Sequence, residues 1–137
     1  MWDIEFYKAL DGKCPTAEFL DGLSRSTDLP FVMNDLDRLE EFGNELRRPQ
    51  ADYLERDIYE LRTETPSGQI RLLYFFFFRE KIIISHGIRK KQKVPKNEID
   101  RAVANRKEYF DRHKRMVEPK AHAEHEVARA QARRKRK

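Results

Sequence analysis

The chain has 137 residues, which allows one domain with a single apolar core and is too short for two ordinary domains. Its single cysteine, Cys14, excludes an internal disulfide, and no other thiol is available for a structural zinc site. The longest apolar run, 72–78, is far shorter than a membrane span, and the first residues lack the pattern of a signal peptide. We therefore expect a cytoplasmic protein without a membrane partner.

Charge is distributed unevenly along the chain. Residues 1–60 carry 7 basic and 15 acidic side chains, a net charge of −8. Residues 61–111 carry 12 basic and 6 acidic side chains, and residues 112–137 carry 10 and 3, which gives net charges of +6 and +7. A basic half is typical of a surface that binds a polyanion, so the functional residues are expected there.

The first 50 residues predict one strand and two helices. Residues 3–8 alternate apolar and polar side chains, which indicates a short strand near the edge of a sheet. Pro15 opens a helix with the apolar stripe Phe19, Leu20 and Leu23. A second helix opens at Asp28 and Pro30, and its apolar positions follow the 3.6-residue period: Val32, Leu36, Leu39 and Leu46.

The rest of the chain predicts a meander and a last helix. Residues 58–63, 69–78 and 82–88 indicate three consecutive antiparallel strands. Pro95 marks the start of the last helix, whose apolar side is Ile99, Ala102, Val103, the methylenes of Arg106, and Phe110. Residues 116–137 lack a core-facing stripe, which indicates a basic helical or disordered tail after a domain of residues 1–115. The order β-α-α-β-β-β-α predicts an α+β domain with helices packed on one side of an antiparallel sheet.

Two arginines lie within the predicted sheet. Arg62 ends the first strand of the meander, and side-chain alternation places it on the same face as Glu60 and Glu64. Arg71 lies inside an otherwise apolar strand, where a charge is costly unless it has a partner. Arg71 therefore either forms a salt bridge with Glu60 or Glu64 across the hairpin or binds a phosphate group.

A run of cations follows the last strand of the meander. Residues 89–96 contain five cations and lead into the N-terminus of the last helix, where the helix dipole favours an anion. One polyanion that such a run of cations could bind is RNA. Cleavage of RNA without a metal needs a base, cations that stabilise the charge on phosphorus, and an acid. Arginine suits the second task, and the proton carriers are sought among Lys90, Lys91, Lys93 and His86. We expect neither a metal nor another cofactor.

Several short motifs occur in a characteristic order. They are Ile58-Tyr59-Glu60-Leu61-Arg62, Ile70-Arg71-Leu72-Leu73-Tyr74-Phe75, His86, Arg89-Lys90, Gln92-Lys93-Val94-Pro95-Lys96, Glu98-Ile99 and Ala102. In this order and spacing they resemble the HigB-like, phage-associated branch of the RelE/ParE toxin superfamily, over roughly residues 2–110. The resemblance implies a RelE-like fold and a toxin of a type II toxin-antitoxin system that cleaves mRNA on the ribosome.

The resemblance also implies partners and site residues. The partners would be mRNA on the ribosome, with contacts to ribosomal RNA, and a cognate helix-turn-helix antitoxin that binds and silences the toxin in a hetero-oligomer. The RNA-cleaving cleft of such toxins maps here to Arg62, Arg71, Arg89, Lys90 and Lys93. Together with the chemistry of the basic run, this gives as predicted catalytic residues Arg62, Arg71, His86, Lys90 and Lys93. The predicted RNA-binding or phosphate-binding residues are Tyr74, Arg89, Lys91 and Lys96.

Three positions depart from the family pattern. Arg89 stands where a lysine is common, Gly87 where an aromatic residue is common, and Val94 where a threonine would cap the helix. Two other functions remain open: a ParE-like inhibitor of DNA gyrase, and a phage-type regulator that binds nucleic acid without cleaving it. The basic tail would contact ribosomal RNA or an acidic segment of the antitoxin.

Overall fold

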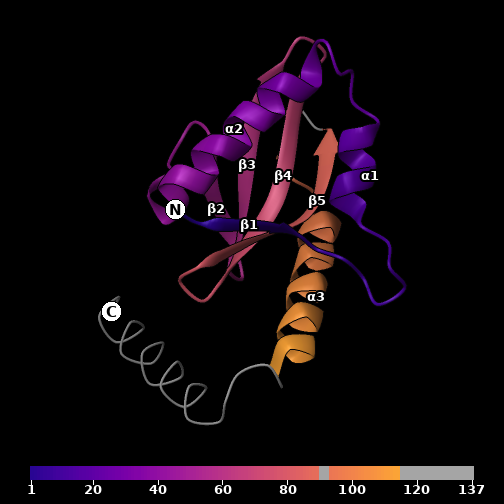
Figure 1. Cartoon of the computed structure of the whole chain (residues 1–137), viewed down its shortest axis with the longest axis vertical. Coiled ribbons are helices and arrows are strands. Elements are labelled where there is room, and N and C mark those ends of the chain that lie inside the picture. Colours follow the sequence, from indigo (N-terminus) through magenta and orange to yellow (C-terminus); the bar gives the residue numbers. More distant parts are fainter. Residues whose placement is uncertain (90–92, 115–137) are drawn as a thin grey trace.

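The computed structural model describes residues 1–89 and 93–114, and in this part of the chain one five-stranded sheet carries three α-helices (Figure 1). The elements, in chain order, are β1 (Asp3–Phe6), α1 (Pro15–Asp21), α2 (Asp28–Phe42), the 3₁₀ helix η1 (Gly43–Glu45), β2 (Ala51–Glu55), β3 (Ile58–Thr65), β4 (Gly68–Phe77), β5 (Lys81–Arg89) and α3 (Lys96–His113). The predicted α+β class is confirmed. The tail predicted at 116–137 lies outside the described residues.

The sheet combines an antiparallel meander with one parallel edge. β2, β3, β4 and β5 pair with one another in sequence order and antiparallel, so the three predicted meander strands are confirmed. β1 forms the opposite edge and pairs in parallel with β5, with Asp3 beside Lys81. The sheet differs from a wholly antiparallel one at this edge, because the long connection through α1 and α2 lets two strands of the same direction lie side by side.

β2 is a strand that the sequence pattern did not predict. It forms an edge of the sheet beside β3, a bulge interrupts this pairing between Tyr53 and Glu55, and only Ala51 among its residues is buried. An edge strand with so little buried surface does not need the alternation of apolar and polar residues that marks an inner strand. The element order therefore contains one more strand than the predicted β-α-α-β-β-β-α.

α1 and α2 cover one face of the sheet. α2 buries Val32, Leu36 and Leu39, which confirms their predicted helical spacing, and these side chains pack with Leu72 and Tyr74 of β4. Truncating one such buried leucine to alanine typically costs about 2–5 kcal/mol. This packing holds α2 along β3 and β4.

α2 is shorter than the sequence pattern predicted. The helix was expected to reach Leu46, but it ends at Phe42. The next residue, Gly43, adopts a φ of 54° directly beside the indole ring of Trp2, a conformation and a proximity that a side chain would not allow. Leu46 instead packs against the core from beyond the 3₁₀ helix.

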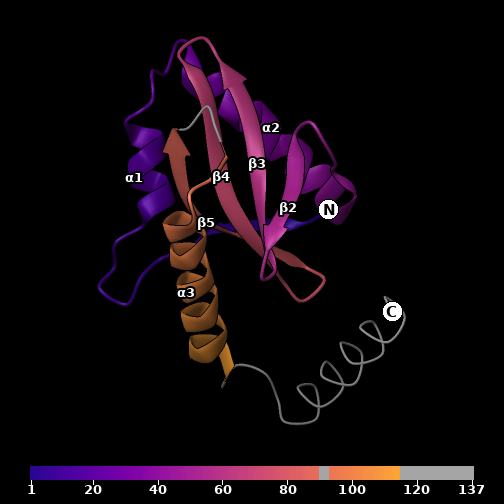
Figure 2. The ribbon, with the colours of Figure 1, turned by 180° about the vertical axis from the view of Figure 1, so that it is seen from behind.

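α3 packs on the other face of the sheet, which Figure 2 shows from behind. The buried apolar side chains of the described residues form two core clusters, one beneath α2 and one beneath α3. Along β4, Leu73 and Phe75 belong to the cluster beneath α3, whereas Leu72 and Tyr74 belong to the cluster beneath α2. α3 contributes to this second cluster its buried residues Ile99, Ala102 and Tyr109. The predicted packing on one side holds for α1 and α2 but not for α3, because the central strands are apolar on both faces and each face needs a cover.

Two hydrogen bonds fix the position of α3 relative to β1 and the residue that follows it. The hydroxyl of Tyr7 donates to Oε1 of Glu108 at 2.7 Å, and the hydroxyl of Tyr109 donates to Oε1 of Glu5 at 3.1 Å. These contacts hold the C-terminal half of the helix. The first turn of α3 therefore has a defined position next to β5, where the candidate site lies.

Candidate active site

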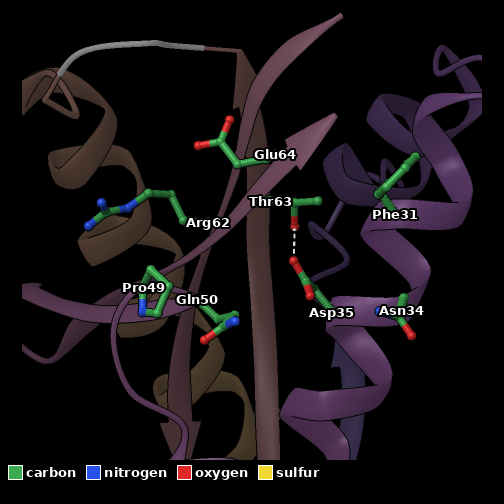
Figure 3. A pocket seen from close by; sticks show the side chains of 8 residues that line it. All are labelled: Phe31, Asn34, Asp35, Pro49, Gln50, Arg62, Thr63 and Glu64. Atoms are coloured by element: carbon green, nitrogen blue, oxygen red, sulfur yellow. Dashed lines mark hydrogen bonds between the residues drawn. The ribbon is translucent and has the colours of Figure 1, made fainter. Parts of the chain in front are cut away.

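Two arginines from neighbouring strands lie side by side on the α3 face of the sheet. Arg62 on β3 is the register partner of Arg71 on β4, and such directly opposed residues have Cβ atoms about 5 Å apart. Figure 3 shows Arg62 and Glu64 pointing away from α2, whereas Thr63 points toward it and donates a hydrogen bond to Oδ2 of Asp35 at 2.8 Å. The side-chain alternation predicted for β3 is therefore confirmed.

One carboxylate holds both guanidinium groups of this arginine pair. Oε1 of Glu60 accepts a hydrogen bond from Nε of Arg62 at 2.8 Å, and Oε2 accepts one from Nη1 of Arg71 at 3.4 Å. The side chains of Glu60 and Arg71 are only 2% and 7% exposed. The salt bridge considered for Arg71 is thus formed with Glu60, and Nη2 of Arg71 also donates to Oε1 of Gln69 at 3.1 Å.

The arginine pair reaches solvent at Arg62, whose side chain is 30% exposed. Its Nη2 lies 3.6 Å from Oδ2 of Asp52 on β2, and the same oxygen lies 2.9 Å from Nη2 of Arg48. An exposed ion pair of this kind contributes at most about 1 kcal/mol. Arg62 can therefore exchange Asp52 for an anionic ligand at small cost, whereas Arg71 is held in place by its buried partner.

A β-bulge brings Ser85 and His86 onto the face of the arginine pair. Leu73 pairs with His86 and Tyr74 pairs with Ile84, so Ser85 is an extra residue of β5 without a register partner on β4. As a result, two consecutive side chains of β5 point toward α3. His86 is then one diagonal step from Arg71, whose own register partner is Ile88.

His86 is the centre of a chain of hydrogen bonds between β5 and α3. Its Nδ1 lies 2.8 Å from Oγ of Ser85, which accepts a hydrogen bond from Nδ2 of Asn105 at 3.0 Å, and its Nε2 lies 3.1 Å from Oε1 of Glu98. Burial and, to a lesser degree, the charge of Arg101 lower the pKa of His86 to about 4, against the opposing effect of Glu98. The imidazole is therefore neutral at neutral pH, and its contact with Glu98 is a hydrogen bond rather than an ion pair.

Arg89 and Tyr74 lie on the opposite face of the sheet. Nη1 of Arg89 is 3.7 Å from Oδ2 of Asp28 at the start of α2. Tyr74 is buried in the core cluster beneath α2 and stacks on Tyr59 with ring centroids 5.5 Å apart. The structure does not bring these two predicted RNA-binding residues to the arginine pair.

The predicted lysines are placed only in part. Lys93 and Lys96 are exposed at the N-terminus of α3, which begins at Lys96. Lys90 and Lys91 lie outside the described residues. The contribution of the basic run to the site therefore stays a prediction.

Two departures from the family pattern have packing reasons. A Cβ atom on Gly87 would lie 2.4 Å from Cδ2 of Phe19 on α1, so a larger side chain does not fit between β5 and this helix. Val94 is buried in the core cluster beneath α3, and the residue that caps this helix, Pro95, has no side-chain hydrogen bond to its first turn. Val94 thus contributes apolar packing where a threonine would contribute a cap.

A groove of about 240 Å³ lies beside β3, on the side of α2 (Figure 3). Its lining residues are Phe31, Asn34, Asp35, Pro49, Gln50, Arg62, Thr63 and Glu64. Figure 3 shows the side chain of Arg62 pointing away from α2, yet Arg62 is one of the lining residues. The groove therefore adjoins the arginine pair at this residue.

Sequence reasoning missed Ser85, Glu98 and Asn105 as members of the site. Glu98 and Asn105 are seven positions apart, which places them on the same side of a helix. Because Glu98 closely follows the basic run, this spacing was the signal that could have found both residues. Ser85 gave no such signal, since its orientation depends on the bulge.

The fold and the site together define a small α+β protein with a RelE-like arrangement, whose sheet carries an arginine pair next to a buried histidine. The chain belongs to the phage-derived Gp49-like family (DUF891), whose sequence model matches residues 18–108. This family is associated with RelE-like toxins. No curated protein matches the chain. Within residues 1–89 and 93–114, no helix is long and apolar enough to cross a membrane.

Proposed function

We propose that this protein is the toxin of a type II toxin-antitoxin system and acts as a ribosome-dependent mRNA endonuclease. The observation that carries the proposal is the arginine pair, Arg62 and Arg71, next to His86 on one face of the sheet. Membership in a family associated with RelE-like toxins supports the class of protein. In this proposal the protein works in the cytoplasm without a metal or other cofactor, and a helix-turn-helix antitoxin binds and silences it.

The arginine pair suits a role at the scissile phosphate. Guanidinium groups are always charged and bind two phosphate oxygens at once, and donors that are already in place stabilise the charge that develops on phosphorus. The partly exposed Arg62 would meet the RNA first, and Arg71 would act from a site of low dielectric constant. Lys93 and Lys96, with the predicted Lys90 and Lys91, would add affinity for the RNA backbone.

Primer extension on mRNA during translation in vitro tests this function. Arg62→Ala is expected to lower cleavage at least about 100-fold, as loss of a preorganised donor typically does. Arg71→Ala and Lys90→Ala should also abolish the cuts, provided that thermal unfolding shows a folded protein. Arg38→Ala, at an exposed position of α2, is the matched control and should cleave like the wild type.

One observation favours a function without RNA cleavage. Both arginines already have carboxylate partners, as purely structural ion pairs would. Growth arrest with intact transcripts and relaxed DNA topology would indicate a ParE-like inhibitor of DNA gyrase. Salt-dependent RNA binding with intact RNA would indicate a phage-type regulator that binds nucleic acid and does not cleave it.

A further inference from the structure

When the imidazole is neutral and Glu98 is a carboxylate, the hydrogen bonds around His86 have one consistent set of directions. The amide of Asn105 donates to Oγ of Ser85, so the Ser85 hydroxyl is free to donate to Nδ1 of His86. The remaining ring proton is then on Nε2 and is donated to Oε1 of Glu98. The chain of donors starts at the partly buried Asn105 and ends on the carboxylate of Glu98.

Among the members of this chain that can take a proton, only Glu98 is open to a ligand. His86 is 1% exposed, and Ser85 is fully buried, so neither can touch an RNA chain on the surface. The side chain of Glu98 is 23% exposed. Any proton that this cluster takes from a substrate must therefore be taken by Glu98.

Glu98 lies on the face of the sheet that carries the arginine pair. Its partner His86 is a diagonal neighbour of Arg71 across β4 and β5, a step of about 7–8 Å between backbone positions. The charged groups on this face include Arg62, Arg71, Glu60 and Glu64 from the strands and Arg101 from α3. A phosphodiester held by the arginines would thus place its sugar within reach of a side chain on the first turn of α3.

We propose that Glu98 is the general base of the RNA cleavage reaction, and that His86 is a positioning residue that holds this carboxylate through Nε2. The inference rests on the proposed endonuclease function and adds to it the group that the lysines and His86 were expected to supply. The neutral imidazole fixes the direction of one carboxylate oxygen, which leaves the other oxygen of Glu98 for the substrate.

The reaction step is balanced with water as the only added reactant. Glu98 takes the proton of the 2′-hydroxyl group while the 2′-oxygen forms a bond to phosphorus. The bond between phosphorus and the 5′-oxygen breaks, its electron pair stays on that oxygen, and a water molecule protonates it. The products are a 2′,3′-cyclic phosphate and a 5′-hydroxyl end, and the carboxyl group of Glu98 returns its proton to solvent.

The test is single-turnover cleavage of mRNA on the ribosome with the full chain. Glu98→Gln keeps an oxygen that accepts the hydrogen bond from His86 but removes the base, so cleavage should fall by about 100-fold or more. Glu98→Asp keeps a carboxylate and should recover part of the rate. Asp100→Asn, at an exposed carboxylate of the same helix, should cleave like the wild type.

Two further measurements separate catalysis from structure. The wild-type rate should fall at acidic pH, and this pH dependence should be absent in Glu98→Gln. Nitrogen NMR should find His86 as the neutral tautomer with the proton on Nε2. His86→Gln should slow cleavage less than Glu98→Gln does and should keep the pH dependence.

The outcomes distinguish this inference from the proposed function. If the wild type does not cleave RNA, the endonuclease proposal fails, and the role of Glu98 fails with it. If the wild type cleaves and Glu98→Gln cleaves at nearly the same rate, only the role of Glu98 is overturned. Loss of cleavage in Glu98→Gln with unchanged RNA binding and an unchanged melting temperature is the expected result.

Discussion

Glu60 determines the electrostatics of the arginine pair, because its two oxygens hold two cations and almost none of its surface meets water. Glu60→Gln is expected to lower the free energy of unfolding by about 3 kcal/mol, since it leaves buried charge without a counter-charge. Glu64→Gln, at an exposed position further along the same strand face, should change it by less than about 0.5 kcal/mol. Urea unfolding at pH 7 measures both values, and equal losses would contradict this role of Glu60.

His86 makes stability depend on pH. Its pKa is lowered to about 4 in the folded state and is near 6.5 in the unfolded state, so the unfolded chain binds an additional proton between these values. Its contribution to stability is therefore complete above about pH 6.5 and falls by about 3 kcal/mol as the pH drops toward 4. Unfolding curves at pH 5 and pH 7 should differ less for His86→Gln than for the wild type. An identical difference in the two proteins would show that other groups cause it.

The face of the sheet on which each site residue lies could be predicted where side chains alternate regularly along a strand. Arg62 and Arg71 follow it, and the sequence placed Arg62 correctly with Glu60 on one face. On β5 the bulge at Ser85 interrupts the alternation, so every later side chain changes face. This single extra residue moves His86 toward α3 and Arg89 toward α2, where it meets Asp28. No residue pattern in the sequence marks the bulge.

At the scale of elements, the end of α2 depends on a glycine that no other residue can replace. Gly43 has a φ of 54°, and a Cβ atom there would lie 1.9 Å from Nε1 of Trp2. Gly43→Ala should therefore cost about 3 kcal/mol or more, from backbone strain and overpacking together. Gly12→Ala is the matched control: Gly12 also has a positive φ, of 90°, but among the described residues a Cβ atom there would meet nothing within 4 Å.

The control separates the two effects in a thermal unfolding experiment. Gly12→Ala should lose only the conformational part, about 1 kcal/mol. The difference between the two variants then measures the contact between α2 and Trp2. Equal losses would mean that the indole ring moves aside without cost.

The elements themselves were predicted where burial is one-sided and periodic. The stripe Val32, Leu36 and Leu39 gave α2, and the apolar runs gave β4 and β5. β2 was not predicted, because a strand with one neighbouring strand and a solvated edge does not need alternating apolar and polar residues. The packing of α3 on the second face could not be predicted either. The residue pattern of a strand that is apolar on both faces does not indicate which helix covers which face.

At the scale of the whole molecule, the two core clusters of the described residues end at Phe110. A variant that ends at residue 114 is therefore expected to have the melting temperature of the full chain. It would lack 8 basic and 3 acidic side chains. If the tail contacts RNA, the plot of log affinity for single-stranded RNA against log salt should become shallower by about 2. Fluorescence anisotropy measures this slope, and identical slopes would exclude the tail from RNA binding.

The parallel pairing of β1 with β5 sets the order in which a nascent chain can finish folding. Asp3 can pair only after Lys81 has been synthesised, and the contact between His86 and Glu98 forms later still. Contacts of such long sequence separation form late, because they need the loop between them to close first. A ribosome that synthesises this protein thus carries an unfinished sheet until Lys81 has been added and has emerged, and the surface with the arginine pair gains its last members only when α3 follows.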